Sequence, residues 1–214
     1  MKVNVGCGIT PTAGWINFDN SFSVRIARWP AAVRVLSGTR VMDAQSREMV
    51  TIANSLGIRF ANATRRIPCA DRSAEAVYSS HMIEHLDRRE ARAFLREVSR
   101  ILRPGGVVRL AAPDLSRLAS DYLATGDADR FVSGTHMVQP RPTGLVPRAR
   151  AAVVGPRHHL WMYDGHSLSA LLQEAGFAEV SVLPPGKTHI ADPGGLDLAE
   201  RADESVYVEG IQPA

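Results

Sequence analysis

The amino-acid sequence predicts a single α/β domain built on a doubly wound parallel sheet. Short apolar runs that end at glycine or at an acidic or amide residue are typical of buried parallel strands. Longer segments between them carry apolar residues every three or four positions, as on one face of a helix. This alternation of strands and helices predicts the fold class. The 214 residues suffice for one hydrophobic core and are too few to favour two ordinary domains.

The first two expected strands set the pattern for the others. Residues 2–5 form an apolar run that ends at Gly6, and residues 15–18 form a second run that ends at Asp19 and Asn20. Each run has the length of a strand and stops at a residue typical of turns. Further strands are expected at 58–60, 76–79, 107–112, 179–183 and 205–211.

The expected helices follow from spacing and from stop signals. Residues 24–57 read as helical, interrupted near Pro30 and Gly38, and form a helical insertion in the domain. Between 88 and 102 the apolar residues fall on one face, and Pro104-Gly105-Gly106 ends that helix. Residues 115–125 continue as a helix. A last helix carries an apolar stripe at Leu168, Leu171, Leu172 and Ala175.

Residues 130–163 break this pattern. The stretch 133–157 contains four prolines and three glycines without a clean period, so we expect a long loop or lid over about 130–163. This segment has no aspartate or glutamate, which makes an anionic substrate one interpretation and codon bias or a solvated loop the simpler one. Its arginines are Arg130, Arg141, Arg148, Arg150 and Arg157.

Composition and charge argue against several classes of protein. Charged residues make up 22% and apolar residues 45% of the chain, as in ordinary globular proteins. A net charge of +3 is too small to favour a nucleic-acid partner. No apolar run approaches the roughly 20 residues of a membrane-spanning helix, so no membrane partner is expected. Cys7 and Cys69 match no zinc spacing and suit a reducing compartment, so we expect a cytoplasmic protein.

A glycine pair follows the first expected strand, and an acid follows the second. In open α/β sheets ligands bind beyond the carboxyl ends of the strands. Gly6-Cys7-Gly8 would let a ligand approach bare backbone. Pro11 stands where a dinucleotide-binding loop has its third glycine, and Asp19 follows the loop too early, which disfavours a pyrophosphate and an NAD-dependent reductase. The pattern favours a ligand whose ribose hydroxyls donate to Asp19.

Five motifs stand out along the chain: Val3-Asn4-Val5-Gly6-Cys7-Gly8, Gly14-Trp15-Ile16-Asn17-Phe18-Asp19, Ser79-Ser80-His81-Met82-Ile83-Glu84-His85-Leu86, Leu102-Arg103-Pro104-Gly105-Gly106 and Glu174-Ala175-Gly176-Phe177. Together and in this order they resemble class I S-adenosylmethionine (SAM)-dependent methyltransferases, in particular a compact subgroup like methyltransferase type 11. In that subgroup the glycine loop runs almost directly into the second strand. The resemblance implies a Rossmann-like sheet of seven strands with the last strand antiparallel, and SAM as cofactor.

Carried over by position, the resemblance implies a role in SAM binding for several motif residues. The loop Gly6-Cys7-Gly8 would contact the cofactor, with its two glycines against the methionine part. Asp19 would bind the ribose. Asn62 stands where many relatives have an aspartate near the adenine amino group, and its carbonyl can accept the same hydrogen bond. Ser80 and His81 would line the wall beside the transferred methyl group.

The segment His81-Met82-Ile83-Glu84-His85 also matches the H-x-x-E-H signature of an inverted zinc peptidase. Two histidines four apart on a helix can share a metal, and the third ligand would be His158, His159 or Glu174. This interpretation leaves the glycine loop and Asp19 unexplained. We therefore expect no metal, and a zinc hydrolase is kept as the less favoured alternative.

The predicted function is transfer of a methyl group from SAM to a small-molecule acceptor. The resemblance favours a hydroxyl of a saccharide or of a molecule like a natural product, and the arginine-rich lid makes an anionic acceptor an option. A base helps when the acceptor is a hydroxyl, and His81, His158 and His159 are the candidates. A SAM-binding protein without turnover is the other alternative. The sequence does not predict the oligomeric state.

Overall fold

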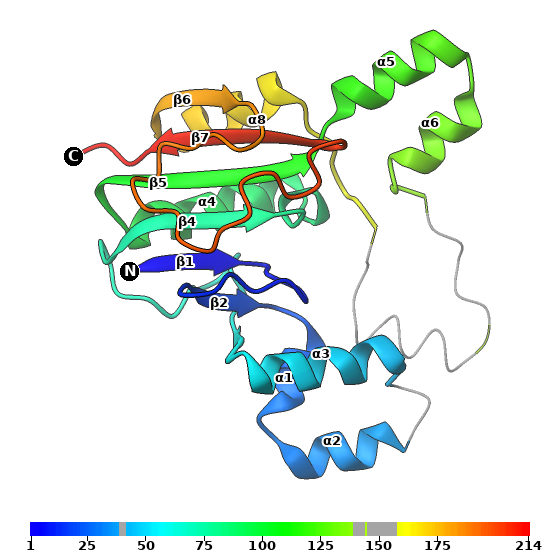
Figure 1. Ribbon diagram of the computed structural model, residues 1–214, viewed down its shortest axis with the longest axis vertical. Coiled ribbons are helices and arrows are strands. Elements are labelled where there is room, and N and C mark those ends of the chain that lie inside the picture. The colour runs from blue at the N-terminus through cyan, green and yellow to red at the C-terminus, as the bar shows by residue number, and fades with distance from the viewer. Residues whose placement is uncertain (39–41, 139–143, 145–157) are drawn as a thin grey trace.

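One seven-stranded sheet forms the centre of the protein in a computed structural model, which describes residues 1–38, 42–138, 144 and 158–214 (Figure 1). The strand order is β3-β2-β1-β4-β5-β7-β6. β7 is antiparallel to both of its neighbours, β5 and β6, whereas β1 to β5 pair in parallel. This confirms the Rossmann-like sheet with an antiparallel last strand. The strands are β1 (Lys2–Val5), β2 (Ile16–Asp19), β3 (Arg59–Phe60), β4 (Ala74–Ser80), β5 (Leu102–Pro113), β6 (Ala178–Leu183) and β7 (Ser205–Ile211).

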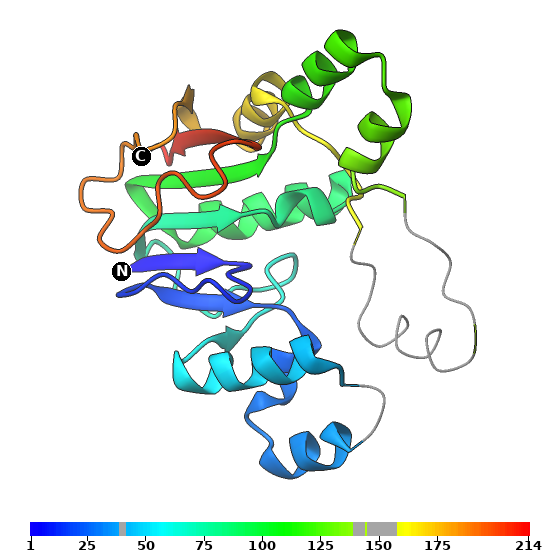
Figure 2. The same cartoon turned by 45° about the vertical axis from the view of Figure 1, so that its right-hand side comes forward.

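Helices cover one face of the sheet and extend beyond it. α4 and α8 lie on the same face, α1 to α3 gather beyond β2, and α5 and α6 project past the end of β5 (Figures 1 and 2). No helix among the described residues is both long and apolar enough to span a bilayer. The helices are α1 (Phe22–Ala27), α2 (Pro30–Ser37), α3 (Ala44–Ser55), the 3-10 turn η1 (Ile83–His85), α4 (Arg88–Ile101), α5 (Leu115–Thr125), α6 (Ala128–Gly134) and α8 (Gly165–Glu174).

The junction between α4 and β5 differs from the expectation. α4 begins at the capping box formed by Asp87 and Glu90, as its amphipathic pattern predicts. β5, however, starts at Leu102 and runs through the proline and glycines that were expected to separate helix from strand. The backbone N–H of Gly105 donates to the carbonyl of Gln212 at 2.9 Å, and the Gln212 N–H donates to the Gly106 carbonyl at 2.8 Å. These bonds pair the segment with the chain after β7, while the positive φ of Gly105 and a register shift against β4 mark an irregularity within the strand.

The opposite face of the sheet is covered by coil rather than by helices. Residues 184–204, between β6 and β7, cross in front of β4 and β5 (Figure 1). The apolar residues between this coil and the sheet are buried, and they form a core separate from the one under α4 and α8. These residues are Trp15, Ala76, Tyr78, Val107, Ala111, Ile190, Leu196 and Tyr207.

A buried ion pair holds this coil on the sheet. Arg109 of β5 and Glu209 of β7 stand opposite each other, both fully buried, with Nη1 and Oε1 2.8 Å apart. Arg109 also donates to the carbonyls of Lys187 and Leu198, at 2.9 Å each. Glu209 accepts from the His189 backbone N–H at 2.7 Å. Because both charges are satisfied partly by the coil, its path is tied to the centre of the sheet.

A ten-residue loop, 6–15, replaces the helix that usually joins two parallel strands. Its backbone is held by buried amide side chains of the strands themselves. The Thr12 N–H donates to Oδ1 of Asn17 at 2.8 Å, and Nδ2 of Asn17 donates to the carbonyls of Thr12 and Trp15, at 3.0 Å each. Asn4 donates to the Thr12 hydroxyl at 3.0 Å. These bonds let so short a connection lie on the sheet without leaving buried polar groups unpaired.

Replacing Arg109 tests the role of the buried pair. We expect Arg109→Ala to lower the free energy of unfolding by about 3–5 kcal/mol, because Glu209 is then buried without its cation. Chemical denaturation measures this, with the exposed α4 residue Arg96 changed to Ala as the control, where a change within about 0.5 kcal/mol is expected. A loss in Arg109→Ala as small as in the control would contradict the structural role.

Candidate active site

The expected cofactor loop and its acid meet where β1 and β2 end. The strands β1, β2, β4 and β5 all point to the same edge of the sheet (Figure 1). At that edge the Gly6 N–H donates to the Phe18 carbonyl at 2.8 Å, and the Gly8 N–H donates to Oδ2 of Asp19 at 3.0 Å. The Ser21 N–H donates to Oδ1 of Asp19 at 2.7 Å. The carboxylate of Asp19 is thereby fixed against the glycine loop.

The two glycines of this loop are needed for different reasons. Both have positive φ angles, 74° at Gly6 and 52° at Gly8, which favour glycine. A Cβ on Gly6 would lie 2.5 Å from Cγ of Met82, whereas a Cβ on Gly8 would have nothing within 4 Å. Gly6 thus permits close packing inside the protein, and Gly8 leaves open space beside the backbone. Between the two glycines the side chain of Cys7 is buried, so its backbone is the part that faces this space. Burial also raises the pKa of the Cys7 thiol to about 12.

Phe60 is a residue at this edge that the sequence analysis missed. It stands opposite Asp19 in the pairing of β2 with β3, so the two side chains lie on the same face of the sheet. Its ring is 36% exposed, which is unusual for a phenylalanine at the end of a strand. No motif marks it, because an isolated aromatic residue after a short strand has no distinctive spacing.

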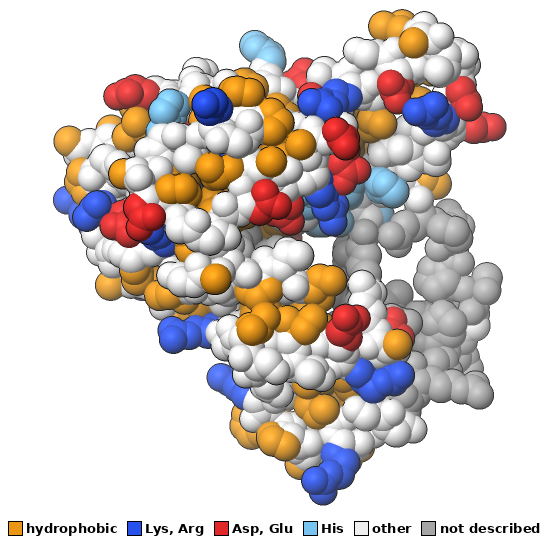
Figure 3. All heavy atoms as spheres, in the orientation of Figure 1, with side chains coloured by type: hydrophobic (Ala, Val, Ile, Leu, Met, Phe, Trp, Pro, Cys, Tyr) orange, Lys and Arg blue, Asp and Glu red, His pale blue; other side chains and the backbone are white. Residues whose placement is uncertain are grey.

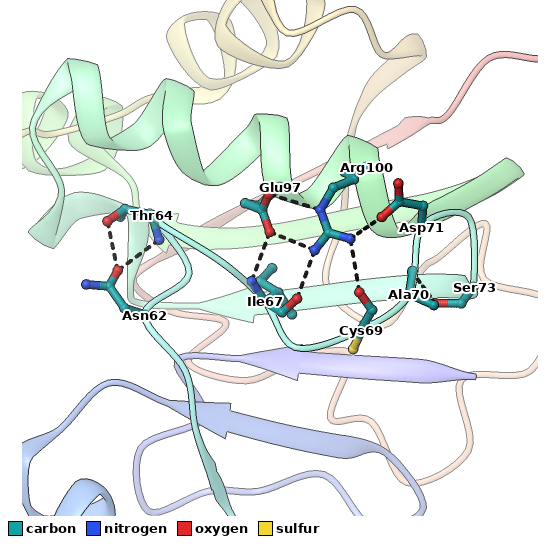
Figure 4. A network of polar contacts seen from close by, with 9 residues as sticks. All are labelled: Asn62, Thr64, Ile67, Cys69, Ala70, Asp71, Ser73, Glu97 and Arg100. Carbon is teal, nitrogen blue, oxygen red and sulfur yellow. Dashed lines mark hydrogen bonds and ion pairs between the residues drawn. The ribbon is translucent and has the colours of Figure 1, made fainter.

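Asn62 takes part in a local turn (Figure 4). Its Oδ1 accepts from the N–H of Thr64 at 3.1 Å and from the Thr64 hydroxyl at 2.8 Å. The following segment is held by Arg100, which donates to the carbonyls of Ile67 and Cys69. The side-chain carbonyl that was expected near the adenine therefore already accepts two hydrogen bonds, and its role toward a cofactor stays a prediction.

The strand alternation of β4 decides which serine faces the glycine loop. Ser80 lies on the face covered by the coil, together with Tyr78. Ser79 lies on the other face, where its Oγ is 3.9 Å from the position that a Cβ on Gly6 would take. Ser79 is therefore the nearer neighbour of the loop, although the sequence comparison singled out Ser80.

His81 ends β4 with both ring nitrogens in contact with the C-terminal part of the chain. Its φ angle of 48° lies in the left-handed region, which is uncommon for a residue with a side chain. Nε2 is 2.8 Å from the Ser205 hydroxyl, and Nδ1 is 3.2 Å from the Arg201 guanidinium. Burial, with the positive charge of Arg201, lowers the pKa of His81 to about 4. The neutral ring therefore accepts from Arg201 through Nδ1 and donates through Nε2.

A cavity of about 500 Å³ opens beside His81, at the ends of β4, β5 and β7. Figure 3 shows acidic, basic and histidine side chains gathered at this end of the sheet, below α5. The cavity is polar, with more carboxylates than guanidinium groups on its wall. Its lining consists of His81, Glu84, His85, Pro113, Asp114, Arg117, Leu118, Asp121, Gly134, His136, Val138, His159, Arg201, Asp203 and Glu204.

Glu84 is the most unusual group in this wall. Its side chain is 1% exposed, and neither carboxylate oxygen has a hydrogen-bond partner in the part of the chain that the structure describes. The nearest ring nitrogens are Nδ1 of His81 at 3.5 Å and Nε2 of His159 at 4.0 Å. Burial raises the pKa of Glu84 to about 8. Burial and nearby His85 and His136 lower the pKa of His159 to about 4.

Comparison with known proteins identifies the family. The profile of a family described as a methyltransferase domain matches residues 3–110, just over half of the chain. The chain belongs to this methyltransferase family. A SAM-dependent methyltransferase from Methanosarcina mazei is similar at 14% identity with a TM-score of 0.54, over 99% of this chain and 92% of its own. One from Thermotoga maritima shares 16% identity with a TM-score of 0.51, over 99% and 81%.

These matches confirm the resemblance seen in the sequence motifs. The identities are low, so the solved structures support the fold alone, and the family match supports the activity. The protein is a SAM-dependent methyltransferase, with SAM as its cofactor.

The methyltransferase does not form the helix that the zinc-peptidase interpretation requires. Residues 83–85 make only a 3-10 turn, and His81 precedes it in a bend with a left-handed backbone, directly after the end of β4. Its ring contacts Arg201 and Ser205 rather than the ring of His85. The structure therefore does not place His81 and His85 on one helix face, as the less favoured zinc-peptidase alternative would require.

The expected lid is described only at its two ends. Residues 128–134 form α6, and His158 and His159 follow the segment 145–157, so Arg141, Arg148, Arg150 and Arg157 lie outside the described residues. His158 contributes its backbone carbonyl, 3.1 Å from Nδ1 of His85, and is not among the described residues that line the cavity. His159 lies in the wall itself.

Alanine at each glycine separates their two roles. We expect Gly6→Ala to cost at least about 1–3 kcal/mol more unfolding free energy than Gly8→Ala, because both have a positive φ but only Gly6 adds a clash with Met82. Urea denaturation of the two variants measures the difference. Equal losses would show that the contact with Met82 can be relieved at no cost.

Proposed function

We propose that this methyltransferase transfers the methyl group to a hydroxyl of a small polyhydroxylated molecule, such as a saccharide or a natural product. The observation that carries the proposal is the place of His81. The residue follows β4, which pairs with β1, the strand that leads into the glycine loop. It also lines the 500 Å³ cavity at the ends of β4, β5 and β7. A donor on one side of His81 and an acceptor on the other would bring the two reactants together.

The glycine loop and Asp19 are the residues that we assign to SAM. The open space at Gly8 fits the methionine part, and each oxygen of Asp19 accepts one hydrogen bond from the protein and has capacity for a ribose hydroxyl. Phe60 is 36% exposed and lies on the same side as Asp19, with the Arg25 guanidinium 5.8 Å from the centroid of its ring, so an adenine would pack on the part of the ring that Arg25 leaves open. When bound, SAM supplies an electrophilic methyl group on a positively charged sulfur.

The cavity supports a small and polar acceptor. Its volume lies in the range of small-molecule sites, about 300–1,000 Å³. Carboxylates such as Asp114 and Asp203 can accept hydrogen bonds from several hydroxyls, whereas they would repel an anionic acceptor. The described wall therefore favours a neutral polyol over the anionic acceptor that the arginines of the lid suggested.

The wall also contains groups that can take up the hydroxyl proton. In methyl transfer the protein aligns the acceptor oxygen with the methyl carbon and removes its proton. His159 is a neutral imidazole on the cavity wall, and its Nδ1 has no hydrogen-bond partner among the described residues. Both ring nitrogens of His81 are engaged by Arg201 and Ser205. Of the three histidines that the sequence analysis proposed as bases, we therefore favour His159 as the group that takes the proton. His81 lines the wall with both ring nitrogens bonded, and His158 contributes its backbone carbonyl.

A panel of acceptors tests the proposed function. The purified protein would be incubated with SAM and with saccharides, phenolic natural products or carboxylates, and release of S-adenosylhomocysteine would be measured. Turnover with a hydroxyl compound supports the proposal. Turnover only with a carboxylate or an amine would overturn the hydroxyl assignment. Binding of S-adenosylhomocysteine with no turnover in any arm would favour the alternative of a SAM-binding protein without activity.

Asp19→Ala tests the ribose contact. We expect the affinity for S-adenosylhomocysteine to fall at least about tenfold, because hydrogen bonds to a charged group are worth about 1.5–3 kcal/mol. Isothermal titration calorimetry measures the affinity. Asp87→Ala is the matched control, since Asp87 also accepts backbone N–H bonds but caps α4. Unchanged affinity in Asp19→Ala would remove the ribose role.

His159→Ala tests the contribution of the cavity wall. Turnover of an acceptor should fall by about 10² to 10⁴, because an imidazole that handles the proton is lost. Affinity for S-adenosylhomocysteine should change less than about threefold, since the cofactor side is untouched. His166→Ala, an exposed histidine of α8, is the control. Parallel losses of turnover and of cofactor affinity would indicate a structural role instead.

A further inference from the structure

We propose that Glu84, His85 and His159 bind a divalent transition-metal ion on the wall of the acceptor cavity. Each residue offers one ligand atom, and these atoms lie within 4.8 Å of one another. Around a tetrahedral ion with bonds of about 2.0–2.2 Å, neighbouring ligand atoms are about 3.4 Å apart. Side-chain rotations that move each ligand atom by roughly 1 Å would bring the three atoms to this spacing.

The buried carboxylate of Glu84 is the first independent support. It is almost fully buried, and both of its oxygens are without a hydrogen-bond partner among the described residues. Such a group is costly to keep inside a protein, because burial removes its water and nothing replaces it. A cation bound at the carboxylate would supply the missing partner.

The orientation of the His85 ring is the second independent support for a metal site. Its Nδ1 lies 3.1 Å from the backbone carbonyl of His158. A carbonyl can only accept, so Nδ1 carries the hydrogen and Nε2 keeps a free lone pair. Histidines that bind metals usually donate their other nitrogen to a carbonyl or carboxylate in this way, which fixes the ring and its tautomer.

Backbone bonds hold the third ligand next to the other two. The carbonyl of Glu84 accepts from the N–H groups of Leu160 and Trp161, at 2.7 and 3.1 Å. This fastens the segment that carries His159 to the 3-10 turn that carries Glu84 and His85. Two short segments far apart in sequence thus present their donors to one point.

The donor set indicates the kind of ion. Two imidazoles and one carboxylate suit Zn²⁺, Co²⁺ or Fe²⁺, whereas Mg²⁺ and Ca²⁺ prefer oxygen ligands. The wall of the cavity has five acidic side chains and two guanidinium groups. This excess of acidic groups would attract a cation. The ring of His136, whose centroid is 5.4 Å from that of His159, packs beside the site.

The catalytic role that we assign to the ion rests on the proposed function, methyl transfer to a hydroxyl. Three protein ligands leave a position toward the cavity for the acceptor hydroxyl, and a metal ion lowers the pKa of a bound hydroxyl. In the transfer the acceptor oxygen would bond to the methyl carbon while the bond from sulfur to that carbon breaks and leaves its electron pair on sulfur. The hydroxyl proton would pass to water in the cavity, because both ring nitrogens of His81 are already engaged by Arg201 and Ser205.

Calorimetry and absorption spectroscopy test the site with the metal alone. The full chain, stripped with a chelator, would be titrated with Zn²⁺ and with Co²⁺, and with Mg²⁺ for comparison. We expect one equivalent of Zn²⁺ or Co²⁺ to bind, with affinity at least about a hundredfold weaker in His85→Ala and in His159→Ala. Glu84→Gln keeps the shape of the side chain and should also weaken binding. The exposed His166→Ala is the matched control and should bind as the unchanged chain does.

Binding of S-adenosylhomocysteine, measured in the same samples, reports on the fold and on the proposed function separately. A chain that binds S-adenosylhomocysteine but no stoichiometric Zn²⁺ or Co²⁺ would overturn the metal site and leave the methyltransferase proposal standing. Equal metal affinity in His85→Ala, Glu84→Gln and His166→Ala would also overturn it. A change of the Co²⁺ spectrum on addition of an unmethylated acceptor that supports turnover supports the contact with the hydroxyl, and no change with such an acceptor would exclude it.

Discussion

The ion pair between Arg109 and Glu209 is the constraint on which the shape of the site depends. Both charges are fully buried in the middle of the sheet, where an unpaired charge would be very costly. Part of their compensation comes from the backbone of the coil 184–204, so the coil cannot leave without exposing or stranding a charge. The same coil brings Arg201 to His81 and Glu204 to the cavity. An interaction in the core thereby positions the rim of the site.

The two faces of the sheet have different tasks. Under α4 and α8 lies a conventional apolar core, which secures the fold. The other face carries irregular chain: the short loop held by Asn4 and Asn17 near Gly8 and Asp19, and the coil held by Arg109 near the cavity. Irregular chain exposes backbone groups and varied side chains to a ligand, whereas a helix would bury its backbone bonds. The chemistry of the site is therefore concentrated at the edge where this face meets the ends of the strands.

Local sequence patterns were sufficient to predict most helices and strands, but they did not predict which side chains these elements bury against one another. The ranges of α5 and β7 were predicted to the residue, because turn-forming residues flank each element directly in the sequence. The burial of Arg109 could not be predicted, since its partner Glu209 is a hundred residues away and the strand otherwise reads as apolar. Which of Ser79 and Ser80 faces the glycine loop could not be predicted for a related reason. The face on which a side chain lies depends on which layers pack on the sheet, and spacing along one strand does not reveal them.

Glu84 shows how a motif can be noticed and still be misread. Its spacing from two histidines suggested a helix, whose periodicity would place His81 beside His85. The chain instead turns sharply after β4, and the third histidine comes from residue 159, brought in by bonds to the Glu84 backbone. A buried carboxylate without a partner lowers the stability of the free protein, and such costs persist at sites where a ligand offsets them. Glu84 lies between the end of β4 and the cavity, so its unpartnered carboxylate is placed to bind a cation at that point.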